Sequence, residues 1–348
     1  MSITVSRDSV PVAPAISRIV CCVPSPSDRW LQVIAHESTP RHWYVCNDHP
    51  RYRLEKWLPP GWRSILASWR AIQTVKRQQA NLLITAEPYL SLWCTLFAAF
   101  QGVKVHHIAW SFHFLTLPQG PLSWLMQWAF PQIQQFTIHS RTDKQLYADY
   151  FGISPTRFER VHWSVTIPNA LPAEPLIPGD YGCVVVRSRQ ECQTAIAALH
   201  HLPNIRMVIV TEPHCLRGLV IPANILLLTN LSPNFRLNVL QYSRFVVVPL
   251  SEPQPCCDYE LLVTAMQFSK ALITADVPGI SDYAFHNSNA ILYPSDRPEA
   301  LAKAIDDLWS NPNKCNFLGS NGKGFAETFC SETALQNCFH QFLVRKGF

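Results

Sequence analysis

The chain has 348 residues, of which 48% are hydrophobic and 15% charged, so it can bury ample apolar surface and is not expected to be intrinsically disordered. No apolar run approaches the ~20 residues that a membrane-spanning helix needs, and the N-terminus shows no secretion signal, which predicts a soluble or peripheral protein. The formal charge of +5 is uneven: residues 1–165 hold 16 Lys and Arg against 9 Asp and Glu, and the remainder 13 against 15.

Short apolar runs alternate with amphipathic segments in the first half, the pattern of βαβ units in a parallel sheet. Residues 62–77 carry apolar side chains at helical spacing, with Arg and Lys elsewhere on the cylinder. The apolar run Leu90–Phe100 has the length of a buried or interfacial helix. Further helices are predicted at 121–130 and 142–150, and strands at 16–23, 82–85, 103–109, 136–139 and 160–165.

A proline-rich segment separates the two halves. Residues 167–180 contain Pro168, Pro172, Pro175 and Pro178, a density that neither a helix nor a sheet tolerates. We expect an N-terminal Rossmann-like domain over 1–167, a linker over 168–180 and a C-terminal Rossmann-like domain over 181–330.

The second half repeats the alternation. Its best-marked helix follows Asp296, because Pro298 and Glu299 open the first turn and Leu301, Ile305 and Leu308 share a face. Two doubly wound α/β domains would place a ligand at the carboxyl ends of their strands, in the cleft between them. Strands are predicted at 183–186, 207–210, 225–228, 245–248, 271–274 and 290–292, and helices at 190–200, 235–242, 259–268, 298–309 and 332–344.

Twelve cysteines occur without the C-x-x-C spacing of metal ligands, and several lie inside apolar runs. Cysteine serves as a small hydrophobic residue in reducing compartments, which favours a cytoplasmic protein. Since no ligand cluster is present, no bound metal and no cofactor are expected.

Two carboxylates, Glu252 and Glu260, have seven residues between them and flank a loop-to-helix junction. A carboxylate can accept hydrogen bonds from vicinal sugar hydroxyls, and a helix N-terminus suits a phosphate. The alternative is that they are helix caps or dipole partners.

The order of motifs around these glutamates resembles the donor-sugar domain of retaining, family-4-type (group 1) glycosyltransferases of the GT-B fold. The E-x7-E motif matches Glu252 and Glu260 and is followed by an LLEAMA-like segment. ALITADVPGISDYA (271–284) and AILYPSDRPEALAKAI (290–305) match two further family segments, and Thr137–Val165 resembles the last strand–helix–strand before the hinge.

The resemblance implies a GT-B enzyme, two Rossmann-like domains facing across a cleft, with the helix in 331–348 crossing back to the first domain. It implies hexose transfer from a nucleotide diphosphate sugar to a glycan or lipid-linked acceptor with retention of configuration, a hexosyltransferase-type activity in polysaccharide biosynthesis. Glu252 would hold the transferred sugar and Glu260 the ribose, and the donor-binding positions would also include Cys256, Cys257 and Gly279.

The family's Arg and Lys that hold the diphosphate are matched by Arg187, with Arg189 substituting for the displaced Lys. Two guanidiniums at a strand's end make a phosphate clamp; the alternative is two solvent-exposed loop arginines. The family often has glycine at the positions of Pro255 and Ser269 and in the loop 24–27, where this chain has none.

The family often places a histidine beyond a strand of the first domain, near the transferred sugar. In VHHIAWSFHF (105–114) this position is His113, with His107 behind it. The resemblance makes His113 a catalytic candidate, and the alternative is a histidine that is packed among aromatic rings.

Other function classes lack their motifs. No G-x-G-x-x-G after a strand, Walker loop or G-x-S-x-G elbow is present, and no nucleic-acid-binding module is found. The rival hypothesis is a catalytically silent partner subunit that binds nucleotide sugar or glycan, which the lost glycines motivate.

The basic first half predicts peripheral attachment to the inner face of an anionic membrane, with Trp and Arg interleaved over 62–77. The alternative is an ordinary solvated surface.

Overall fold

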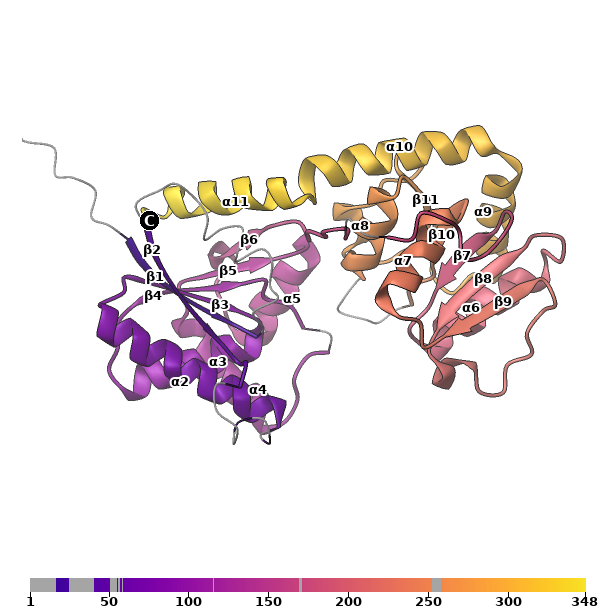
Figure 1. Ribbon diagram of the computed structural model, residues 1–348. Helices are drawn as coiled ribbons and strands as arrows, with labels where there is room; N and C mark the ends of the chain where they lie inside the picture. Colours follow the sequence, from indigo (N-terminus) through magenta and orange to yellow (C-terminus); the bar gives the residue numbers. More distant parts are fainter. Residues whose placement is uncertain are drawn as a thin grey trace, which may run out of the picture. The chain divides into compact units, whose positions relative to one another are not determined.

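The chain forms two six-stranded sheets with helices packed on them (Figure 1). This computed structural model describes residues 17–24, 41–50, 55, 57, 59–114, 116–168, 171–251 and 258–348. Contacts divide the chain into two compact units, one of residues up to 110 with 129–136 and 343–348, the other of residues 111–128 and 137–342. The predicted two-domain α/β architecture of the GT-B type is confirmed, while the predicted boundaries at 167 and 181 stay a prediction.

The first sheet has the strand order β2-β1-β3-β4-β5-β6, and its registered pairs run parallel. Two of its central strands are almost completely buried, as expected when helices cover both faces of a parallel sheet. The strands are β1 (Ser17–Val23), β2 (Arg41–Asn47), β3 (Leu82–Ala86), β4 (His106–Trp110), β5 (Gln135–Ile138) and β6 (Phe158–Arg160).

Four helices follow strands of this sheet: α2 (Pro60–Gln78), α3 (Pro88–Phe100), α4 (Pro121–Ala129) and α5 (Arg141–Phe151). Helix α2 packs its apolar stripe on β1 and β2. Helix α5 begins at a capping box in which Ser140 Oγ accepts from the Asp143 N–H and the Asp143 carboxylate accepts from the Ser140 N–H. It ends at Gly152, whose φ of 65° is left-handed.

The second sheet has the order β12-β11-β10-β7-β8-β9, again with parallel pairs. Its strands form the middle of one apolar core with the helices that cover them. The strands are β7 (Gly182–Val185), β8 (Met207–Thr211), β9 (Ile225–Thr229), β10 (Phe245–Val248), β11 (Ala271–Asp276) and β12 (Ala290–Pro294).

The helices of this half are α6 (Arg189–His200), α7 (Pro233–Tyr242), α8 (Tyr259–Gln267), α9 (Pro298–Ser310), α10 (Pro312–Phe329) and α11 (Glu332–Arg345). Helix α10 was not expected, because its three glycines disfavour a helix. Gly319 explains one of them: a Cβ there would lie 2.1 Å from the Ser269 carbonyl oxygen, so glycine lets α10 pack against backbone.

Helix α11 lies where the sequence predicts a final helix. The residues that follow it, together with the end of α11, belong to the first compact unit, and Arg41 Nη2 donates a 2.9 Å hydrogen bond to the Phe348 carbonyl oxygen. Its predicted role in crossing back between domains stays a prediction.

Two predicted strands differ from the structure: the one at 103–109 begins three residues before β4, and the one at 160–165 overlaps β6 only at Arg160. Residues 103–105 follow the turn at Gln101 and Gly102 (φ 64°) and are irregular, and Val103 and Val105 pack on the core without joining a ladder. After β6, the Val161 N–H still donates to Ile138 O at the end of β5, but the N–H groups of Trp163 and Val165 donate outside the sheet, to Tyr283 Oη and Cys330 O.

Strand β2 was missed. It is half-buried over most of its length, and only Cys46 is fully buried, so it lacks the apolar run of the central strands.

Candidate functional site

The strand order of the second sheet reverses at β7. From β7 the chain proceeds through α6 to β8 on one side, and later returns to β10 on the other. In open parallel sheets a ligand binds outside the carboxyl ends of the strands at such a switch point. Arg187 follows β7, and α8 begins after the loop that leaves β10.

Arg187 lies beside the first turn of α8. Its Nε is 2.7 Å from Oδ2 of Asp258, the N-cap residue of α8. The Arg187 side chain is 56% exposed and that of Asp258 only 10%. Burial raises the pKa of Asp258, and the Arg187 charge opposes that rise.

The backbone beside Arg187 is also held by a carboxylate. Glu191 Oε2 accepts from the Arg187 N–H at 2.7 Å and from the Ser188 N–H at 3.2 Å, as part of the capping box that starts α6. Burial raises the pKa of Glu191. Arg187 is therefore fixed at its backbone by one helix start and at its side chain by another.

Glu260 is exposed in the first turn of α8, two residues after Asp258. The position is open to a ligand at the helix N-terminus, where backbone N–H groups favour an anion. The other predicted residues of this loop, Glu252, Cys256 and Cys257, lie outside the described residues.

Arg189 has a different partner from Arg187. Its Nη1 donates to the Arg217 carbonyl oxygen, beyond the short helix η4 (Pro213–Leu216). The structure thus places the two guanidiniums on separate partners, and a two-arginine clamp stays a prediction.

Gly279 follows β11 with φ 93°, in the left-handed region where glycine is favoured. It starts η5 (Ile280–Asp282), at whose end Asp282 is buried and paired with two arginines. Asp282 Oδ1 lies 3.1 Å from Arg141 Nε and 2.5 Å from Arg160 Nη1, and Oδ2 accepts from the Arg141 N–H at 2.7 Å.

His113 lies just past the carboxyl end of β4, as predicted. Its ring is 5.9 Å from that of His139, 5.7 Å from Trp163 and 6.0 Å from Tyr259, the first residue of α8. Burial lowers the pKa of His113 to about 4, so the imidazole is neutral at pH 7. Within this compact unit His113 is packed among aromatic rings close to the residue that precedes Glu260.

His139 is held in one tautomer. Its Nδ1 donates to the Val161 carbonyl oxygen at 3.0 Å, so its Nε2 accepts from Ser111 Oγ at 2.8 Å. Ser111 has φ 55°, a strained conformation for serine, at the end of β4. Burial lowers the pKa of His139 to about 3.

Asp258, Glu191 and Asp282 were not identified from the sequence. The S-x-x-E spacing of Ser188 and Glu191 is a capping-box signal that would have located Glu191, and an acidic residue just before a helix marks Asp258 as a cap. Nothing local marks Asp282, because its partner Arg160 lies 122 residues away.

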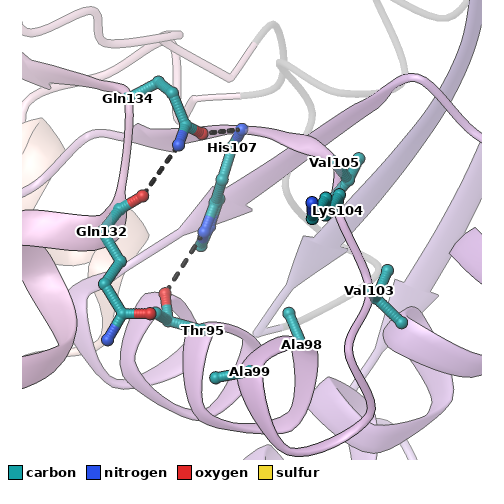
Figure 2. A pocket seen from close by; sticks show the side chains of 9 residues that line it. All are labelled: Thr95, Ala98, Ala99, Val103, Lys104, Val105, His107, Gln132 and Gln134. Carbon is teal, nitrogen blue, oxygen red and sulfur yellow. Dashed lines mark hydrogen bonds between the residues drawn. The ribbon is translucent and has the colours of Figure 1, made fainter.

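A cavity of about 240 Å³ lies in the other compact unit. His107 is one of its lining residues: its Nδ1 is 3.3 Å from Thr95 Oγ1, and its N–H donates to Gln134 Oε1 (Figure 2). The Nε2 of His107 is 2.9 Å from Thr85 Oγ1. Because His107 lies near the amino end of β4, this cavity is at the sheet edge opposite the one where ligands bind.

In the described ranges, no three or more His, Cys, Asp and Glu side chains gather as metal ligands. None of the helices there is both long enough and apolar enough to cross a bilayer.

Residues 189–325 match the family model described as Glycosyl transferases group 1. This range includes Arg189, Glu260 and Gly279 and begins two residues after Arg187. No curated protein sequence matches the chain.

Solved structures share the fold at low identity. A sucrose-phosphate synthase from Thermosynechococcus elongatus is similar with a TM-score of 0.70 and 13% identity, over 94% of this chain and 98% of that one. A glycosyltransferase from Rickettsia africae gives 0.68 and 13%, over 94% and 98%. HepE of Anabaena, solved with UDP, gives 0.66 and 12%, over 94% and 100%.

Proposed function

We propose that the chain is a glycosyltransferase that moves a hexose from a nucleotide diphosphate sugar to a glycan or lipid-linked acceptor, with retention of configuration. One observation carries the proposal: Arg187 and the first turn of α8, with Glu260, come together at the switch point of the second sheet. The match of residues 189–325 to group 1 glycosyl transferases supports the same reaction class, as do similar structures solved with UDP and UDP-glucose.

In this proposal the donor's diphosphate lies at the N-terminus of α8 against the Arg187 guanidinium, which stabilises the charge that builds up on the leaving group. Glu260 accepts hydrogen bonds from the ribose. Glu252 contacts hydroxyls of the transferred hexose, and neutral His113 contacts the sugar from the end of β4. Water exclusion and proximity supply the remaining rate enhancement.

A thermal-shift screen against nucleotide sugars tests the proposal. A ligand that binds only the folded protein stabilises it by about 2.7 kcal/mol at a hundredfold excess over its dissociation constant. We expect one nucleotide sugar and its nucleoside diphosphate to raise the melting temperature, and the parent nucleoside to raise it less. No shift with any donor of the panel would refute the proposal.

A silent binding subunit is the second candidate. It is favoured by the position of Arg189 at the Arg217 carbonyl oxygen, because only Arg187 of the two predicted clamp residues is then paired at the start of α8. The loss of glycine at 269 does not add to it, because Ser269 keeps the left-handed backbone with φ 59°. Turnover separates the two candidates, since a binding subunit would hold the donor without releasing nucleotide.

We also propose that helix α2 attaches the protein to an anionic membrane on its cytoplasmic side. Trp62 is 62% exposed and Trp69 38%, and Lys76 and Arg77 are exposed at the end of the same helix. Between Pro60 and Phe100 the only acidic residue is Glu87. Exposed Trp beside Lys and Arg suits the headgroup region of an anionic bilayer, and a lipid-linked acceptor would be reached there.

A further inference from the structure

Asp258 has a second interaction beyond capping its helix. Its Oδ1 accepts from the Leu261 N–H at 3.2 Å, which is the N-cap bond of α8. Its Oδ2 is buried, has no hydrogen-bond partner within the described ranges, and faces Arg187 Nε at 2.7 Å as an ion pair. Oδ1 of Asp258 therefore caps the helix, and Oδ2 forms the ion pair with Arg187.

The cap alone does not require a carboxylate. The neighbouring helices α6 and α7 are capped by the hydroxyls of Ser188 and Ser232, each accepting from one backbone N–H. Burying a carboxylate is costly unless a cation is paired with it. The helix cap does not account for the charge of Asp258; Arg187 is its main cationic partner, and Arg236 makes a smaller electrostatic contribution.

The pair leaves one edge of the guanidinium available. Arg187 has five N–H donors in a planar fork, and Asp258 engages the Nε side. The side chain is 56% exposed, and the fork's two Nη atoms are the edge that binds a phosphate in bidentate fashion. A long arginine side chain that is free in solvent loses rotamer freedom when it binds a ligand, which costs conformational entropy. Because the ion pair with Asp258 already restricts the Arg187 side chain, less of this entropy is lost when phosphate binds.

We infer that Asp258 is a positioning residue that orients Arg187 toward the phosphates of the donor. This inference rests on the proposed function and adds a residue to it. Asp258 does not contact the donor; it acts through the guanidinium. Its effect should therefore exist only for ligands that carry phosphate and only while Arg187 is present.

A double-mutant cycle by calorimetry tests this inference. The ligands are UDP, GDP, ADP and TDP, and the tightest is compared with its own nucleoside. Asp258→Ser keeps a capping hydroxyl and removes the partner of Arg187. We expect it to weaken nucleoside diphosphate binding by about tenfold and to leave nucleoside binding unchanged. In the Arg187→Ala background the same substitution should change the affinity less than about twofold.

Asp307→Ser is the matched control. Asp307 also pairs with a cation, Lys314 Nζ at 2.6 Å, but between α9 and α10, and its loss should leave nucleotide affinity unchanged. Melting temperatures of all variants show that each is folded.

The outcomes separate the inference from the proposed function. If the wild type binds none of the four diphosphates, the proposed function fails and this inference fails with it. If the wild type binds but Asp258→Ser binds equally well, or weakens binding equally in both backgrounds, the positioning role alone is wrong. Tighter binding by Asp258→Ser would also overturn it, because Asp258 would then compete with phosphate for Arg187.

Discussion

The hydroxyl of Tyr283 donates a 3.0 Å hydrogen bond to the carbonyl oxygen of His139, which lies 144 residues earlier in the chain. The same hydroxyl accepts from the Trp163 N–H at 2.8 Å, and the Tyr283 ring stacks on that of Tyr259 at 4.8 Å. One buried phenol thus joins the end of β5, the segment after β6 and the start of α8. These are the segments that surround His113.

Replacing Tyr283 with Phe should destabilise the fold. The substitution keeps the ring but leaves a buried carbonyl and a backbone N–H without their partner, at a cost of about 1–3 kcal/mol. Urea denaturation measures the free energy of unfolding. Tyr293→Phe is the control, because the buried Tyr293 hydroxyl has no hydrogen-bond partner in the part of the chain described. This substitution should lower the free energy of unfolding by less than about 0.5 kcal/mol. Equal losses in both variants would contradict the assigned bonds.

Buried neutral histidines should make stability fall in acid. Burial lowers the pKa of His107 and His139 to about 3 and of His113 to about 4. The unfolded chain binds these protons below about pH 6.5 and the folded protein does not, so their contribution is present above that pH and is lost as the pH falls. Burial raises the pKa of the Asp143 carboxyl to about 6. This shift has the opposite effect on stability: its stabilising contribution is fully present below the pKa of Asp in the unfolded chain and is lost as the pH rises toward 6.

The His107→Gln variant isolates one of these protons. We expect the free energy of unfolding, measured with denaturant between pH 6.5 and 4, to fall less steeply with falling pH in this variant than in the wild type. The difference in slope should correspond to the uptake of about one proton on unfolding. An unchanged slope would mean that His107 is charged in the folded protein.

Replacing Ser269 with glycine should stabilise the folded protein. It follows α8 with φ 59°, a left-handed conformation that costs an L-residue about 1–2 kcal/mol. Ser269→Gly should therefore raise the melting temperature. Ser243→Gly, at the end of α7 with φ −71°, should lower it, because glycine there adds freedom to the unfolded chain and removes the buried hydrogen bond that Ser243 Oγ donates to the Leu240 carbonyl oxygen at 2.9 Å. A lower melting temperature for Ser269→Gly would show that the strain is absent.

The sequence was informative where structure is local. Apolar runs located the central strands of both sheets, while motif order alone selected Gly279 and Glu260, whose roles in donor binding stay predictions. It failed where packing between distant segments decides: α10 is a helix despite its glycines because Gly319 packs on the backbone of Ser269. Asp258 was missed because its partner Arg187 is 71 positions away in the chain and the pairing depends on the order of strands.

Membrane attachment through α2 should depend on both aromatic and basic side chains. On cosedimentation with anionic vesicles, Lys76→Ala/Arg77→Ala should weaken binding by about 2 kcal/mol, since each basic residue near the surface contributes about 1. Trp62→Ala/Trp69→Ala should weaken it also at high salt, where charge is screened. Trp124→Ala, exposed on α4, is the control and should bind as the wild type. Absence of wild-type binding at low salt would end this proposal.

The central claim is that the site at Arg187 and the start of α8 holds a nucleotide diphosphate sugar and activates it. Release of free nucleotide from the donor found in the screen, by purified wild type and by Glu260→Gln, tests it most directly. We predict slow release by the wild type, and weaker donor binding with slower release by Glu260→Gln at an unchanged melting temperature, since a neutral amide accepts the ribose bonds less strongly. Donor binding with no nucleotide released by the wild type would contradict the claim and leave a binding subunit in its place.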